Sequence, residues 1–403
     1  MTKWEQNYQH YQYYECLKKF YYNPALGDEN LPLSKIYIHP DFQIYKHEKY
    51  GDRQEDLHTY INQRLKATKQ GQLWLLLGQP GQGKTSFCYR LVHDQLKHPP
   101  VAHCFYFIKL RDVDDHETLI KTPFKILSQH LREEEQLSVN LKQQQKLILV
   151  LDGLDELYMS RSLDRPALRA FYNKLQKKVA NNPAWTIVLT SRHHYLEEKY
   201  LDTNNATVLK IAPLTLGQQL DWLTIYKTVY PNAVLNIERI EVINDQYQLK
   251  FKHVRELIEQ PILLHMVARS GLDLQVNTSK SDLYKTLFDT LIQKNTEGDR
   301  DERYQFLTTT AGRQQFRHWL QEVAYAIHQS DQEYVTRAAL KTSVFTHQIL
   351  KDQELGVDTG LRHVLVAFYF KKNNHEAGAL EFLHKSLQEY LTAEYFLRRI
   401  EEE

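Results

Sequence analysis

The sequence has few of the features that would place it in an oxidising compartment or in a membrane. It has three cysteines among 403 residues, Cys16, Cys88 and Cys104, which is an odd number without a disulfide spacing pattern. No apolar run approaches the roughly 20 residues that a membrane-spanning helix needs. The N-terminus lacks the apolar core of a signal peptide. We therefore expect a cytoplasmic protein without membrane association.

An excess of charge of either sign is also missing. The chain has 51 Lys and Arg against 50 Asp and Glu, a formal net charge of +1, so nucleic acid is not indicated as a partner. The 19 histidines raise the question of a metal site. Five candidate ligands are close in the sequence but straddle a predicted helix, a Pro-Pro break and a strand: Cys88, His93, His98, His103 and Cys104. We interpret them as ordinary surface and core residues.

Apolar segments alternate with helical segments between residues 71 and 213. We predict strands at 72–77, 102–110, 146–151, 185–190 and 207–211. Helices are predicted at 84–97, 116–131, 165–180 and around 194–200. The strands are apolar without alternation, which is typical of strands buried on both faces. The pattern predicts an α/β fold in which a parallel sheet is flanked by helices.

The segments on either side have a different character. Residues 1–70 are predicted to be a mostly helical region, with a loop around Pro32 and Pro40 before a helix near 55–67. Helical patterns dominate from Leu214 onward, so we expect a helical domain at 214–299. Residues 300–403 have further helices and a hairpin that turns between Lys371 and Gly378, which favours a winged-helix-like domain.

A glycine-rich segment follows the first strand of the 71–213 region. In "LWLLLGQPGQGKTS" the glycines, Lys84 and Thr85 fit the pattern GxxxxGK[ST] between a buried strand and a helix start. Unpaired N–H groups, the helix dipole and the lysine attract phosphate, and the threonine hydroxyl can bind Mg²⁺. We therefore expect ATP or ADP and Mg²⁺ at this loop, with the nucleotide contacted by Gly78, Gln79, Pro80, Gly81, Gln82, Gly83, Lys84, Thr85 and Ser86.

Acidic residues follow a second buried strand, in "KLILVLDGLDEL". The strand delivers Asp152 to the carboxyl end of the sheet, where ligands of such folds bind, so Asp152 is predicted to hold Mg²⁺ with Thr85. Asp155 and Glu156 follow, and either could orient or deprotonate the attacking water. The pattern does not decide which of the two acids is the base.

An arginine follows a third buried strand, in "TIVLTSRHHY". A guanidinium at this edge of the sheet can contact the γ-phosphate through a forked interaction. We therefore predict Arg192 to be the third catalytic residue.

Taken together, "GQPGQGKT", "LDGLDEL" and "LTSR" resemble the NACHT family of STAND P-loop ATPases, over roughly residues 50–400. "FLHKSLQEYLTAEYF" at 382–396 is similar to the winged-helix motif of that family, and "EQPILLHM" at 259–266 is similar to its adenine-contacting segment. The resemblance implies that Pro261 packs on the adenine and that His384 contacts the phosphate of ADP.

The same resemblance implies a mechanism. ADP would hold a closed monomer, ATP would open it, and the opened molecules would self-associate, with slow hydrolysis resetting the switch. It also implies a trigger or effector partner and, for bacterial members, antiphage defence. Two other functions remain open: an AAA+-like ATPase that uses a winged helix on nucleic acid, and a P-loop kinase. The balanced charge argues against the first, and the paired acids and long helical tail argue against the second.

Overall fold

The computed structural model describes residues 3–22, 24–25, 28–67, 70–97, 104–113, 115–137, 139–144, 147–159, 164–193, 195–196, 201, 206–245, 252–271, 280–297, 309–330, 334–336, 366–370, 378–382 and 385–402. The chain divides into two compact units. The first consists of Met1–Asn23, Pro32–Pro213 and Lys371–Asn373, and the second of Pro24–Leu31, Leu214–Phe370 and Asn374–Glu403.

A seven-stranded sheet in the order β4-β3-β9-β5-β8-β7-β6 forms the centre of the first unit. Five neighbouring strands are parallel, as predicted: β9 (Ala206–Ile211), β5 (Gln72–Leu77), β8 (Trp185–Ser191), β7 (Leu147–Asp152) and β6 (Cys104–Lys109). All residues of β7 are buried, as are Leu73 to Leu77 of β5. This burial on both faces explains why their sequences are continuously apolar.

Two strands extend the sheet where the sequence predicted only a loop. β3 (Phe42–Lys46) pairs antiparallel with β9, and β4 (Lys49–Tyr50) pairs antiparallel with β3. Phe42 and Ile44 are buried while the residues between and after them are less so. This period-two pattern covers only five residues and follows Pro40, which is why the loop prediction was wrong.

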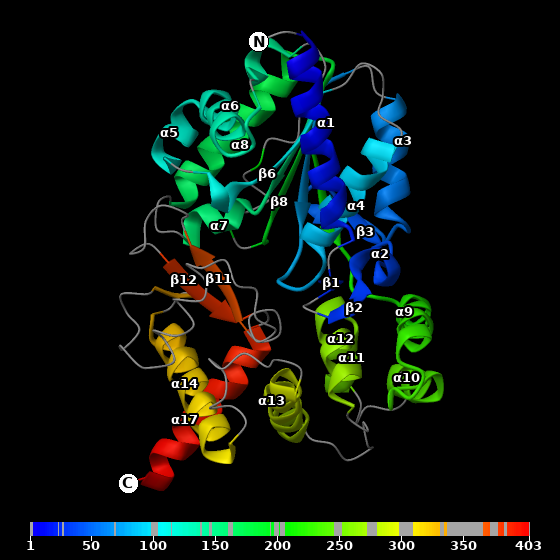
Figure 1. Ribbon diagram of the computed structural model, residues 1–403, viewed down its shortest axis with the longest axis vertical. Coiled ribbons are helices and arrows are strands. Elements are labelled where there is room, and N and C mark those ends of the chain that lie inside the picture. Colours follow the sequence, from blue (N-terminus) through cyan, green and yellow to red (C-terminus); the bar gives the residue numbers. More distant parts are fainter. Residues whose placement is uncertain are drawn as a thin grey trace. The chain divides into compact units, whose positions relative to one another are not determined.

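Helices cover both faces of this sheet (Figure 1). α1 (Lys3–Phe20), α3 (Leu57–Ala67) and α4 (Lys84–Lys97) lie on one side, and α5 (His116–Lys121), α6 (Pro123–Glu133) and α8 (Arg165–Ala180) on the other. The single helix predicted at 116–131 is interrupted, because Pro123 lacks an N–H group and starts a new helix. Around 194–200, Tyr195 and Leu196 are not helical, and residues 194 and 197–200 lie outside the described part.

The N-terminal helix α1 packs on the body of the first unit. The buried Tyr13 hydroxyl donates to Phe107 O at 3.0 Å and accepts from Phe107 N at 3.0 Å. Phe107 belongs to β6, the last strand of the sheet order. The tyrosine therefore satisfies backbone groups that an edge strand would otherwise leave unpaired.

The second unit is mainly helical, as expected. Its helices are α9 (Leu216–Val229), α10 (Ile237–Asn244), α11 (Lys252–Ile258), α12 (Pro261–Ser270), α13 (Lys280–Glu297), α14 (Thr310–Gln329) and α17 (Lys385–Glu402). The helical pattern across residues 251–270 forms two helices, because the chain breaks before Pro261, which starts α12. None of the described helices is both long enough and apolar enough to cross a membrane.

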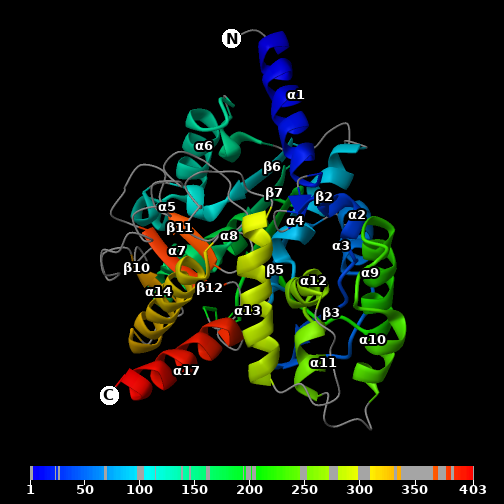
Figure 2. The same cartoon turned by 60° about the horizontal axis from the view of Figure 1, so that its bottom comes forward.

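The predicted hairpin is present in this unit. β11 (Val366–Phe370) and β12 (Gly378–Phe382) pair antiparallel, with Phe370 opposite Gly378, and the short β10 (Val335–Thr336) joins them in the order β10-β12-β11. Figure 2 shows α14 running beside this sheet. The winged-helix assignment and the four-part domain division remain predictions.

Three short elements lie between α1 and β3: β1 (Pro24–Ala25), β2 (Asp28–Pro32) and α2 (Leu33–Ile36).

Candidate nucleotide site

The glycine-rich loop joins β5 to α4 at the carboxyl edge of the parallel sheet. Gly81 and Gly83 have φ values of 76° and 86°, a left-handed conformation that favours glycine. The side chain of Gln82 folds back inside the loop, where its Oε1 accepts from Gln79 N at 2.6 Å. The first bond of α4 runs from Phe87 N to Gly83 O, so the N–H groups before Phe87 have no intrahelical partner. These donors are suited to phosphate oxygens.

Lys84 lies across this loop. Its ammonium donates to Gly78 O at 2.8 Å and to Gln79 O at 3.1 Å. Burial lowers the pKa of Lys84, while the negative charges of Asp155 and Asp152 oppose the shift. A bound phosphate would favour the charged form further, which is the arrangement expected of a phosphate-binding lysine.

Three oxygen groups from three elements meet at the end of β7. The Thr85 hydroxyl of α4 donates to Asp152 Oδ2 at 2.8 Å, and the Thr190 hydroxyl of β8 donates to Asp152 Oδ1 at 2.6 Å. Thr190 also accepts from Gly153 N at 2.8 Å. Asp152 is 5 % exposed and Thr85 is exposed at the loop. Hard oxygen donors grouped in this way fit Mg²⁺.

The sequence did not identify Thr190 as part of this group. The residue belongs to the "LTSR" segment, but only its arginine was singled out there. A hydroxyl near the end of a largely buried strand is the signal that could have revealed it, because a buried hydroxyl needs a hydrogen-bond partner.

The structure brings Asp155 and Arg192 together as a buried ion pair. Arg192 Nε lies 2.9 Å from Asp155 Oδ2, and Arg192 N donates to Asp155 Oδ1 at 3.2 Å. Their side chains are 5 % and 6 % exposed. The pair fastens the start of α7 (Leu154–Met159), a helix that the sequence did not predict, to the end of β8.

Glu156 is placed differently from its neighbour. It is half-buried, and its Oε2 lies 4.0 Å from Arg111 Nε, near the end of β6. Gly153, with φ 87°, leaves room for it, because a Cβ there would lie 2.6 Å from the Glu156 carboxyl carbon. The two acids therefore have distinct environments, although they are adjacent in the sequence.

The contacts predicted for the two remaining residues stay predictions. Pro261 is the first residue of α12 in the second unit. His384 lies outside the described residues.

Comparison with known proteins identifies the domain that carries the loop. Residues 72–219 match the model of the NACHT domain family. The chain contains a NACHT domain. This match begins at β5, includes the loop, Asp152 and Arg192, and ends in α9. The NACHT domain is a P-loop NTPase, a class that binds ATP or ADP with Mg²⁺ and hydrolyses ATP. No curated protein matches the chain.

Several solved structures are weakly similar to the NACHT-containing chain. A Drosophila ORC structure bound to DNA has 13 % identity, 83 % coverage of this chain, 84 % of that chain and a TM-score of 0.35. The Cdc6p of Pyrobaculum aerophilum has 15 % identity and a TM-score of 0.32, and the match covers 84 % of this chain and 92 % of that chain. A STAND protein of Pyrococcus horikoshii with a tetratricopeptide repeat sensor has 12 % identity and a TM-score of 0.33, and the match covers 82 % of this chain and 42 % of that chain.

Proposed function

We propose that the protein is a nucleotide-operated switch that binds ADP in a closed state and ATP in an open state. The observation that carries the nucleotide assignment is the contact of Thr85 with Asp152 beside the glycine loop and Lys84. Bound Mg²⁺ would supply positive charge to the phosphates there, held by Thr85 and Asp152. The loop N–H groups and the lysine would position the nucleotide.

We further propose separate roles for the two acids. Glu156, which is partly accessible, would orient or deprotonate the attacking water, whereas Asp155 would hold Arg192 in place. A γ-phosphate would compete with Asp155 for the Arg192 guanidinium. Exchange of this buried partner is a means by which the third phosphate could alter the structure.

The switching behaviour rests on the resemblance to NACHT and STAND proteins. It comprises contacts of Pro261 with adenine and of His384 with the ADP phosphate, slow hydrolysis, self-association with ATP, and a trigger or effector partner. A cytoplasmic location and antiphage defence belong to the same proposal. Phage plating on bacteria that express the wild type or the Lys84→Ala variant would test the defence role.

The test of nucleotide binding is Lys84→Ala with Lys97→Ala as its control. Lys97 is the exposed last residue of the same helix, so it matches the loss of charge away from the loop. Loss of a hydrogen bond to a charged group costs roughly 1.5–3 kcal/mol, so calorimetry should show ATP and ADP binding about 10- to 100-fold weaker in Lys84→Ala alone. Equal affinities in both variants would refute the assignment.

A further inference from the structure

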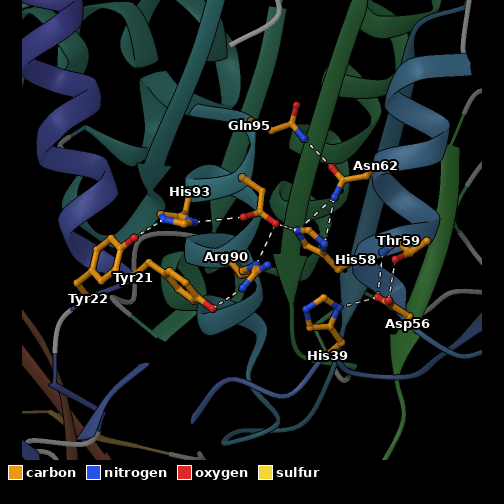
Figure 3. Close-up of polar contacts among 11 residues, drawn as sticks. Tyr21, Tyr22, His39, Asp56, His58, Thr59, Asn62, Arg90, His93 and Gln95 are labelled. Atoms are coloured by element: carbon orange, nitrogen blue, oxygen red, sulfur yellow. Dashed lines mark hydrogen bonds and ion pairs between the residues drawn. The ribbon is translucent and has the colours of Figure 1, made fainter. Parts of the chain in front are cut away.

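A cluster of two histidines and an aspartate lies away from the nucleotide loop in the first unit. His39 follows α2, Asp56 immediately precedes α3, and His58 is in the first turn of α3. One potential ligand atom from each lies within 4.8 Å of the other two. Within the described residues, this is the one group of three metal-ligating side chains that meets this distance. Figure 3 shows the three residues and their neighbours.

We propose that His39, Asp56 and His58 bind a divalent transition-metal ion, with zinc as the preferred probe. Two imidazoles and one carboxylate form a donor set that zinc accepts with a fourth position left for water. The nitrogen ligands disfavour Mg²⁺ and Ca²⁺, which take oxygen ligands. This site is independent of the nucleotide proposal, because it shares no residue with the loop.

The contact between His39 and Asp56 is compatible with a bound metal ion. His39 Nδ1 and Asp56 Oδ1 are 2.9 Å apart, joined by a hydrogen bond whose proton the metal would replace. The Asn62 amide would have to turn away from His58, because its Nδ2 lies 3.1 Å from His58 Nδ1 and 3.3 Å from Nε2. The rings of His39 and His58 have centroids 5.1 Å apart and meet edge to face. Ligand atoms about 2.0–2.1 Å from zinc lie roughly 3.3 Å apart in a tetrahedron, so side-chain movements of about an ångström would complete the site.

A carboxylate beside His58 gives the cluster a further feature of known metal sites. His58 is 4 % exposed, and its Nε2 lies 3.1 Å from Asp94 Oδ2 on α4. A carboxylate bonded to the second nitrogen of a metal-bound imidazole orients the ring and increases its basicity.

The side chains of Asp56 and His39 are exposed enough for a metal ion to reach the cluster from solvent. Both are half-buried, with side chains 39 % and 36 % exposed. Asp56 is held with φ 51° and caps α3, where its Oδ1 accepts from Thr59 N at 2.9 Å. A metal here would tie the segment before β3 to the first turn of α3, beside the helix that starts at the nucleotide loop.

Zinc titration of the full chain, free of any polyhistidine tag, tests the proposal. Calorimetry should show one zinc per chain, and the melting temperature should rise with zinc. His39→Gln should weaken zinc binding by at least about 10-fold, which is the smaller loss seen even when only a hydrogen-bond partner of a metal ligand is removed. His39 is half-buried, so this variant is expected to fold, which circular dichroism would check. His58→Gln should give the same loss.

Two controls separate this site from other zinc ligands. His47→Gln removes an exposed histidine from the turn after β3 and should leave the affinity unchanged. Cobalt bound in place of zinc should show no thiolate-to-metal absorption, which would instead indicate the cysteines. Absence of stoichiometric binding, binding that His39→Gln does not weaken, or a thiolate spectrum would each overturn the proposal.

Discussion

At the scale of single residues, the site depends on how buried polar groups satisfy one another. Asp152 accepts hydroxyl groups from Thr85 and Thr190, and Asp155 accepts from Arg192 through both side chain and backbone. Such groups are costly to leave without partners in a protein interior. The adjacent acids Asp155 and Glu156 consequently differ in what their loss should change.

Glu156→Gln should slow single-turnover ATP hydrolysis with little change in stability, because the lost carboxylate acts on water. Each tenfold loss in rate corresponds to about 1.4 kcal/mol of transition-state stabilisation. Asp155→Asn should instead reduce the free energy of unfolding by about 3–5 kcal/mol, since it removes the charge that Arg192 faces in a buried pair. Quenched-flow kinetics and denaturant unfolding would measure the two effects.

Glu117→Gln is a suitable control, because it removes an exposed carboxylate from α5. It should change neither the rate of single-turnover ATP hydrolysis nor the free energy of unfolding. The reverse result, with Asp155→Asn stable but slow and Glu156→Gln fully active, would exchange the roles of the two acids.

At the scale of elements, one arginine joins three helices of the second unit. Arg317 on α14 forms a forked contact with Glu394 on α17, at 2.9 Å and 2.7 Å, and it also contacts Asp289 on α13. Tyr390 OH donates to the same carboxylate. Burial alone would raise the pKa of Glu394, but the hydrogen bonds from Arg317 and Tyr390 outweigh it and hold that pKa below its usual value.

Glu394→Gln should therefore destabilise the chain by about 3 kcal/mol, as expected when one partner of a buried pair is removed. Because the folded pKa is depressed, the contribution is present above the ordinary glutamate pKa of 4.5 and is lost as pH falls through the folded pKa. Thermal melts at several pH values would measure it. Glu389→Gln, an exposed change on the same helix, is the control. Equal melts for the two variants would contradict the role of the pair.

Helices and strands were predicted correctly where their apolar or helical sequence pattern extended over many residues. The five parallel strands and α4 have long apolar or helical patterns, and their predicted bounds lie within two residues of the observed ones. Short amphipathic elements were missed, such as β3 with five residues and α7 with six. The break at Pro123 was also overlooked, although a proline inside a helical pattern is a recognised stop signal.

At the scale of the whole molecule, what the sequence could not supply is contact between distant segments. The loop, Lys84 and Thr85 are contiguous and were predicted with their chemistry. The pairing of Asp155 with Arg192 and the cluster of His39 with His58 arise only when separate strands and helices meet. The histidines that the sequence analysis considered as metal ligands, from His93 to His103, are not members of the cluster of His39, Asp56 and His58.

The central claim is that the nucleotide controls the association state. Light scattering on the Glu156→Gln variant, which should bind ATP without hydrolysing it quickly, tests this most directly. With ADP and Mg²⁺ the mass should be that of one chain, 47.9 kDa, and with ATP and Mg²⁺ it should rise to a multiple of that mass. Calorimetry on the same sample would establish that both nucleotides bind. An unchanged monomer mass with ATP fully bound would contradict the account.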